Sequence, residues 1–146
     1  MIPRVVAIVQ ARMGASRLPG KVLLPLAGRP VLAHVVERVR AASEVDEVVV
    51  ATTEGLPDDP VAQLGSKLGA RVFRGSEIDV LSRYAGAAEA SNADIVVRIT
   101  ADCPLIDPDV LAEMVVRFHR LRTGAEPADV LTNARVRSFP RGLDVE

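Results

Sequence analysis

Short runs rich in Val and Ile alternate with helical segments along the whole chain, and this alternation limits the possible folds more than any other feature. The runs lie at 5–9, 47–51, 71–73, 94–99 and 129–131. Strands that are apolar on both faces, separated by amphipathic helices, are typical of a parallel sheet covered by helices on both sides. The sequence therefore predicts an α/β fold.

Four segments between the runs have the periodicity of helices. The first covers 31–42, with its apolar residues on one face. Asp59-Pro60 and Asp107-Pro108 predict the starts of the second and fourth helices, because Asp is a favoured N-cap and proline fits the first helical position. The second helix is expected to end near Gly69, and the third to follow Ser76. The residues expected to face inward on the last two helices are Val80, Leu81, Tyr84 and Ala88, and Leu111, Met114, Val115, Phe118 and Leu121.

Composition excludes several classes of protein. The 146 residues fit a single domain, 1–146, and the only cysteine, Cys103, cannot form an internal disulfide. The net charge of −1 provides no overall field to attract nucleic acid or an anionic membrane, so neither is expected as a partner. No apolar run reaches the length of a membrane span, and the first residues lack a signal-peptide pattern. A cytoplasmic protein is expected.

The loop at 10–21 is the richest candidate site. It follows the first strand and combines Gly14, Ser16 and Gly20 with the cations of Arg12, Arg17 and Lys21. Glycines allow the backbone to approach a ligand, and arginine and lysine bind phosphate oxygens. Parallel sheets bind ligands at the carboxyl ends of their strands, which is where this loop lies. The spacing matches neither a Walker A motif nor a dinucleotide fingerprint. Phosphate binding is the favoured interpretation, and a polar turn with solvated cations is the alternative.

Three further residues follow other strands. Asp102 comes just after the fourth strand, where a carboxylate can hold a Mg²⁺ ion that bridges phosphate oxygens; the alternative is a turn residue that accepts nearby amides. Thr52, after the second strand, could contact a base or ribose, or could be an ordinary turn residue. Arg74, after the third, could contact a phosphate or base, or could only precede a helix capped by Ser76.

Several motifs resemble the cytidylyltransferase family, which includes the acylneuraminate and 3-deoxy-manno-octulosonate cytidylyltransferases. The spore coat polysaccharide biosynthesis protein F branch shows the resemblance best, and the resemblance covers essentially the whole chain. The four segments that carry it are QARMGASRLPGK at 10–21, RGSE at 74–77 continuing to DVL at 79–81 and RY at 83–84, RITADCPLID at 98–107, and FPRGLDVE at 139–146.

The resemblance implies a Rossmann-like nucleotidyltransferase fold with three layers and a nucleoside triphosphate substrate, for which CTP is expected. It assigns Arg12 and Lys21 to the triphosphate, the backbone of Gln10 and Ala11 to the base, and Asp102 to Mg²⁺. Gly14, Ser16 and Arg17 complete the nucleotide-binding set, and Arg12, Lys21 and Asp102 are the expected catalytic residues. The implied reaction transfers CMP from CTP to a sugar, with an acidic sugar expected, and releases pyrophosphate in surface polysaccharide biosynthesis.

The chain stops at Glu146, directly after a segment that resembles ordered structure. In the family, a second metal-binding carboxylate and many sugar and dimer contacts come from a C-terminal half. The chain is therefore expected to be the N-terminal portion of a longer protein, which could form a homodimer. Two alternatives remain open at this point: a transferase for another nucleotide or acceptor, and a non-catalytic nucleotide-binding module.

Overall fold

A parallel sheet of four strands forms the centre of the molecule. The structure is a computed structural model that describes residues 2–137 and 139–146. The strands are β1 (Val5–Gln10), β4 (Glu47–Thr53), β5 (Arg71–Gly75) and β6 (Ile95–Thr100), in the order β5-β4-β1-β6. Val9 of β1 pairs with Val50 of β4 on one side and with Ile99 of β6 on the other. The predicted parallel sheet is confirmed, and β1 lies inside it.

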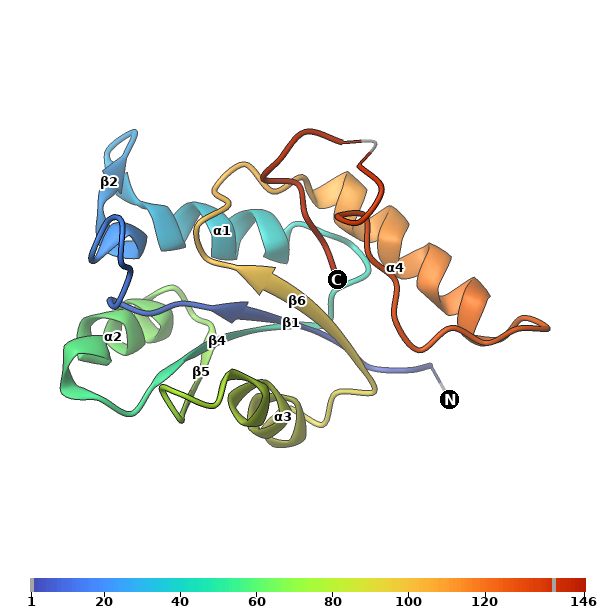
Figure 1. Cartoon of the computed structure of the whole chain (residues 1–146), viewed down its shortest axis with the longest axis horizontal. Helices are drawn as coiled ribbons and strands as arrows, with labels where there is room; N and C mark the ends of the chain where they lie inside the picture. The colour runs from blue at the N-terminus through green and yellow to red at the C-terminus, as the bar shows by residue number, and fades with distance from the viewer. Residues whose placement is uncertain (1, 138) are drawn as a thin grey trace.

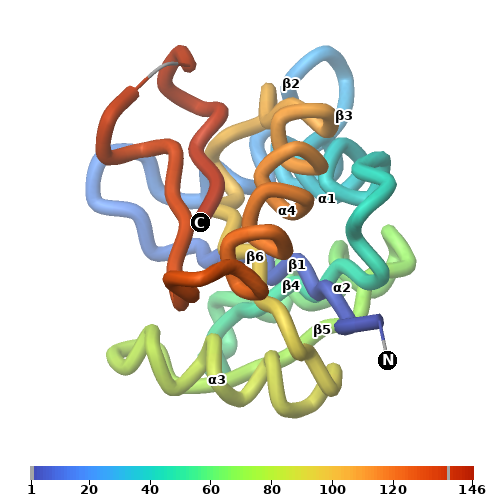
Figure 2. Tube along the Cα trace, turned by 90° about the vertical axis from the view of Figure 1, so that its right-hand side faces the viewer, coloured from blue at the N-terminus to red at the C-terminus, as the bar shows by residue number. Residues whose placement is uncertain are grey.

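Four helices and three short elements complete the described fold (Figures 1 and 2). The helices are α1 (Val31–Arg40), α2 (Asp59–Lys67), α3 (Val80–Ala90) and α4 (Pro108–Arg122). The short elements are a 3-10 turn η1 (Lys21–Leu23), a hairpin of β2 (Pro25–Leu26) and β3 (Arg29–Pro30), and a second 3-10 turn η2 (Leu56–Asp58). The sequence did not predict the hairpin, because its two-residue strands leave no periodic pattern.

The core has two parts because side chains alternate between the two faces of the sheet. Val5, Ala7 and Val9 of β1 belong to the larger part, which also includes residues of α1, α2 and α4. Val6 and Ile8 belong to the smaller part, which contains residues of α3. The molecule therefore has three layers, with three helices on one face of the sheet and α3 on the other.

The edge strand β6 differs from the other strands in its burial. Ile95, Val97 and Ile99 are buried, whereas Val96 between them is 38% exposed. The prediction of a fifth strand at 129–131 is wrong, since no strand is assigned there. The backbone N–H of Arg98 donates instead to the carbonyl oxygen of Glu146, at 2.6 Å. A short run forms a strand only when it pairs with a neighbouring strand, and 129–131 does not pair with the edge strand β6.

The start of α2 differs from the prediction by one residue. Asp58 occupies the N-cap position, the helix begins at Asp59, and Pro60 is the second helical residue. The carboxylate of Asp58 accepts from the backbone N–H of Met13 at 2.6 Å, so it does not cap the helix. Asp59 forms an ion pair with Arg74 at 2.6 Å.

The starts of α3 and α4 agree with the sequence prediction to different degrees. Ser76 does not cap α3; its hydroxyl accepts from the backbone N–H of Asp79, and Asp79 caps the helix by accepting from Ser82. Leu81 is 80% exposed, so its predicted inward orientation is wrong. Asp107 caps α4 as predicted.

None of the described helices is both long enough and apolar enough to cross a membrane.

Candidate active site

A polar pocket of about 390 Å³ lies at the carboxyl ends of β1 and β6. The loop after β1 forms one wall, and the end of β6 with the residues after it forms the other. The lining residues are Gln10, Arg12, Gly14, Ala15, Ser16, Arg17, Leu18, Lys21, Val22, Arg98, Thr100, Ala101 and Asp102. Most of the predicted site residues therefore line one pocket, although they come from segments about eighty residues apart.

Lys21 and Asp102 form an ion pair across this pocket. The ammonium Nζ lies 2.6 Å from Oδ2 of Asp102, and the two side chains are 34% and 43% exposed. The hydrogen bond from Lys21 holds the pKa of the Asp102 carboxyl below its ordinary value, against the opposing effect of burial. Asp102 is therefore ionised at neutral pH and can bind a cation, and Lys21 is positioned to bind an anion.

The loop after β1 is held by its own backbone and by a distant carboxylate. The carbonyl oxygen of Met13 accepts from the N–H groups of Ala15 and Gly20, at 3.0 and 2.9 Å. Gly20 has φ +69°, and a Cβ there would lie 3.0 Å from Cε of Met13, so glycine is needed for this turn. Asp58 accepts from the N–H of Met13. The loop thus keeps a fixed path while the side chains of Arg12, Ser16 and Arg17 are exposed.

Gln10 and Ala11 continue the sheet into the pocket. The carbonyl oxygen of Gln10 accepts from Ala101, and the N–H of Ala11 donates to Ala51, both at 3.0 Å. Gln10 lines the pocket, whereas Ala11 is buried and does not. The N–H of Ala11 is therefore engaged within the sheet.

Thr52 and Arg74 lie outside this pocket. Arg74 donates to the carbonyl oxygens of Thr53 and Gly55 at 2.8 and 2.9 Å, in addition to its ion pair with Asp59. These contacts join the ends of β4 and β5 and leave its guanidinium engaged by the protein. Thr52 is fully buried, and its hydroxyl oxygen has no partner among the described residues.

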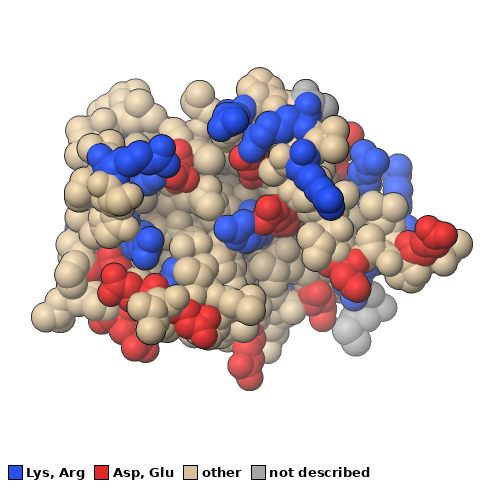
Figure 3. Space-filling view, in the orientation of Figure 1, with Lys and Arg blue, Asp and Glu red and all other residues tan. Residues whose placement is uncertain are grey.

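The charges that could bind a ligand belong to the site itself and not to an extended basic surface. Figure 3 shows basic and acidic side chains interspersed on the viewed face, without one continuous basic surface. Arg98 lines the pocket, pairs with Glu146 and lies with Cζ 5.8 Å from the centroid of the Tyr84 ring. Burial raises the pKa of the Cys103 thiol, so this thiol is protonated at neutral pH and is a poor nucleophile.

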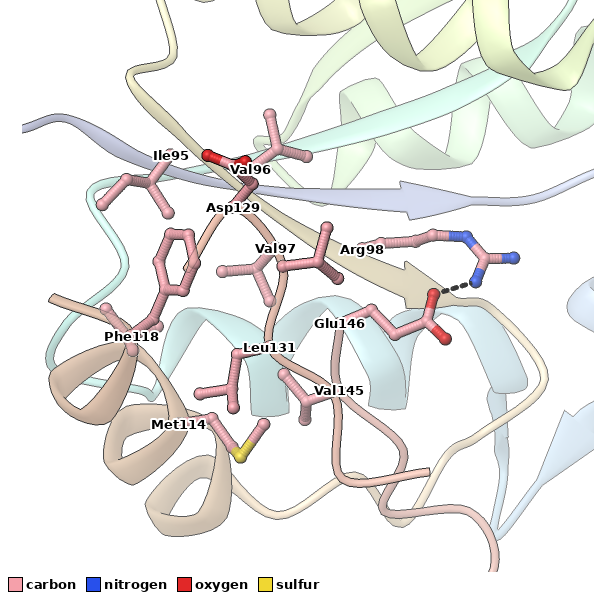
Figure 4. Close-up of a pocket in the computed structure, with 12 residues that line it drawn as sticks. Ile95, Val96, Val97, Arg98, Met114, Phe118, Asp129, Leu131, Val145 and Glu146 are labelled. Atoms are coloured by element: carbon pink, nitrogen blue, oxygen red, sulfur yellow. Dashed lines mark hydrogen bonds and ion pairs between the residues drawn. The ribbon is translucent and has the colours of Figure 1, made fainter. Parts of the chain in front are cut away.

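A second pocket, of about 250 Å³, lies between β6, α4 and the last residues of the chain. Its lining is mainly apolar, with Met114, Phe118, Leu131 and Val145 around it and the ion pair of Arg98 and Glu146 at one end (Figure 4). Because it has few polar groups to bind phosphate, the polar pocket is the better candidate for a nucleotide site.

Residues 6–133 match the model of one protein family, the cytidylyltransferases. The chain belongs to the cytidylyltransferase family. It is 43% identical over 112 residues to the spore coat polysaccharide biosynthesis protein SpsF of Bacillus subtilis, covering 74% of this chain and 47% of that protein. It is 41% identical over 129 residues to a 3-deoxy-manno-octulosonate cytidylyltransferase of Anaeromyxobacter dehalogenans, covering 84% of this chain and 52% of that one.

Solved structures of cytidylyltransferases have the same fold. A cytidylyltransferase from Leptospira borgpetersenii superimposes with a TM-score of 0.88 at 41% identity, covering 99% of this chain and 59% of that one. A CMP:2-keto-3-deoxy-manno-octonic acid synthetase solved with CTP gives a TM-score of 0.72 at 30% identity, covering 80% and 47%. The predicted Rossmann-like nucleotidyltransferase fold is confirmed. The chain spans about half the length of the relatives it matches.

Sequence reasoning about this cytidylyltransferase chain missed two residues that shape the site. Asp58 fixes the loop after β1, and no local pattern indicates a contact with Met13, which is 45 positions away. Arg83 is 1% exposed, although arginine is rarely buried. It lies within a segment that carries the family resemblance, and that was the only signal for it.

Proposed function

We propose that this chain forms the CTP-binding part of a nucleotidyltransferase that transfers CMP from CTP to a sugar and releases pyrophosphate. The observation that carries the proposal is the pocket in which Lys21 and Asp102 meet at 2.6 Å, next to Arg12 and Arg17. Membership of the cytidylyltransferase family supports the identity of the nucleotide. One relative was solved with CTP, which supports the same substrate.

The charges of the pocket suit a triphosphate. The cations of Arg12, Arg17 and Lys21 would neutralise phosphate oxygens, with arginine offering a planar pair of donors and lysine a compact charge. Gly14 lines the pocket and is exposed, so the ligand can approach the backbone there. The same arrangement would stabilise the charge that develops on pyrophosphate as it leaves.

The donor set fits a magnesium ion that arrives with the nucleotide. Asp102 is an exposed, ionised carboxylate in the pocket, and no group of three possible metal ligands occurs in residues 2–137 and 139–146. Mg²⁺ is commonly held by one or two carboxylates together with substrate phosphates. Asp102 would hold the ion, which when bound would supply neutralisation of phosphate charge.

In the proposed reaction, a sugar hydroxyl attacks the α-phosphorus of CTP in line with the leaving group. The new P–O bond joins the sugar to CMP, the bond between the α-phosphorus and its bridging oxygen breaks, and the hydroxyl proton passes to water. Arg12 and Lys21 would orient the triphosphate and neutralise the departing pyrophosphate, so catalysis would depend mainly on positioning and charge. The relatives make an acidic sugar the expected acceptor and surface polysaccharide biosynthesis the expected role.

The experiment is a pyrophosphate-release assay with CTP, Mg²⁺ and a panel of acidic and neutral sugars. Lys21→Ala is expected to lower turnover about 100-fold or more, because it removes a charge that stabilises the transition state. Lys67→Ala is the matched control, since Lys67 is the only other lysine and is exposed on α2. Full turnover in Lys21→Ala would contradict the proposal, and a preference for ATP or GTP would favour a transferase of another nucleotide.

A further inference from the structure

Arg98 is a cation of the polar pocket that the proposed function does not use. It lines this pocket together with Thr100, and the two side chains lie on the same face of β6, because side chains alternate along a strand. The cations proposed to bind the triphosphate, Arg12, Arg17 and Lys21, come from the loop after β1, which forms the other wall. Arg98 therefore adds a positive charge opposite the triphosphate-binding loop.

The guanidinium of Arg98 already holds a carboxylate. Nη1 donates to Oε2 of Glu146, and the two side chains are 46% and 39% exposed. An ion pair as exposed as this one contributes little to stability. A ligand that brings its own carboxylate can therefore replace Glu146 on Arg98 at little cost.

The ring of Tyr84 supports the guanidinium of Arg98. Cζ lies 5.8 Å from the ring centroid, within the range of a cation–π attraction. Tyr84 belongs to α3 and is buried, so the ring provides a fixed platform. The guanidinium does not depend on Glu146 alone for its position, and its planar fork of donors suits the two oxygens of a carboxylate.

The position of Arg98 suits an acceptor better than a triphosphate. Arg98 lines both the polar and the apolar pocket, and Figure 4 shows its ion pair with Glu146 at one end of the apolar one. The rise of a strand places its backbone about 7 Å before that of Thr100, on the side away from Asp102. A molecule that binds beside the triphosphate can therefore reach Arg98 from the polar pocket.

We propose that Arg98 binds the carboxylate of an acidic acceptor and thereby determines the preference for a sugar acid over a neutral sugar. The inference rests on the proposed function. The acceptor carboxylate would take the place of Glu146 on Arg98, and the attacking hydroxyl would lie toward Asp102 and the phosphates. A neutral sugar brings no charge to replace that of Glu146, so it would leave the ion pair closed.

The test measures binding of sugar acids, 3-deoxy-manno-octulosonate among them, and of their carboxamides, which lack the charge. Calorimetry gives the dissociation constants on protein that holds Mg²⁺ and a non-cleavable CTP analogue. Arg98→Met should bind the preferred acid about 10- to 100-fold more weakly, the loss expected for hydrogen bonds from a charged donor. Its affinity for the carboxamide and for tripolyphosphate should not change. Arg137→Met is the matched control, since Arg137 forms a similarly exposed ion pair with Asp144 and does not line the polar pocket.

A substitution at Glu146 separates carboxylate recognition from a structural role of the ion pair. Glu146→Gln removes the internal competitor, so it should bind the acid about two- to fivefold more tightly and the carboxamide as before. If the pair only supported the fold, Arg98→Met and Glu146→Gln would weaken binding alike, because each breaks the same contact. Opposite effects of the two substitutions on acid binding are therefore the expected result, and parallel effects would overturn the inference.

Failure of the inference and failure of the proposed function give different results. If the wild type binds neither CTP nor tripolyphosphate, the proposed function is wrong. If the wild type binds CTP but prefers no sugar acid to its carboxamide, the function stands and carboxylate recognition by Arg98 is refuted. A loss of tripolyphosphate affinity in Arg98→Met as large as the loss for the acid would also refute it, since Arg98 would then be a phosphate ligand.

Discussion

The substitution Asp102→Asn should change triphosphate binding in opposite directions with and without magnesium. Without the metal, Asp102 holds Lys21 at 2.6 Å and places a negative charge beside the phosphate pocket. A triphosphate must then displace Asp102 from Lys21 and approach an anion. With the metal, the same carboxylate is the proposed link between protein and ion. Asparagine removes the charge and keeps the size of the side chain, so it separates these two effects.

The size of the metal-free effect follows from the geometry. The Lys21 and Asp102 side chains are 34% and 43% exposed, so their ion pair is an exposed one, worth about 0.5–1 kcal/mol. Repulsion between the carboxylate and one phosphate charge about 5 Å away in water adds roughly 0.8 kcal/mol before salt screening. Removing both penalties favours binding by about 1.5 kcal/mol, or roughly tenfold in the dissociation constant.

Calorimetry with tripolyphosphate in a chelator measures the first effect, and pyrophosphate release with CTP and Mg²⁺ measures the second. Asp102→Asn should bind tripolyphosphate about tenfold more tightly without the metal and lose about 100-fold or more in turnover with it. Its melting temperature should remain within about 4 °C of the wild type, because the pair contributes little to stability. Asp109→Asn, an exposed carboxylate in the first turn of α4, is the control. Unchanged or weaker metal-free binding would refute the competition between Asp102 and phosphate for Lys21.

Two further predictions concern stability. Gly86→Ala should lower the free energy of unfolding by about 1–2 kcal/mol. The new Cβ would lie 2.5 Å from Cζ of Phe73, and this overpacking outweighs the better helix propensity of alanine. A urea midpoint at or above that of the wild type would show that the ring moves aside. Burial alone would raise the pKa of Glu47, but hydrogen bonds from Arg71 and Arg4, both at 2.7 Å, hold it below its ordinary value. The resulting stability is present above the unfolded pKa and is lost as the pH falls through the lower folded pKa. Glu47→Gln should therefore melt about 3 °C lower at pH 7, with the difference closing below about pH 4, and a difference independent of pH would contradict the ion pairs.

The sheet could be predicted because the apolar pattern that indicates each strand lies within that strand's own segment. Runs such as 5–9 and 47–51 are apolar on both faces, which favours burial in a parallel sheet wherever their neighbours lie. The run at 129–131, Asp-Val-Leu, contains only two apolar residues and forms no strand. The backbone N–H of Arg98 on the edge strand β6 donates to Glu146 instead, a contact that nothing within 129–131 reveals.

The helix starts show how a distant contact decides between adjacent residues. Asp58 and Asp59 are chemically equivalent candidates for the cap of α2. The outcome depends on the N–H of Met13, which binds Asp58, and on Arg74, which binds Asp59. At α4, by contrast, Asp107 has no competing partner of this kind among the described residues and caps the helix through Asp109 and Val110, as predicted.

The candidate site divides according to strand order, which a sequence does not reveal. Because β1 lies between β4 and β6, the loop after β1 meets Asp102 on one side, and Thr52 and Arg74 lie on the other. A pattern of loop residues can place all of these at one edge of the sheet but cannot say which of them share a pocket. Asp102→Asn tests the side toward β6, where the phosphate pocket lies, and should therefore change tripolyphosphate binding.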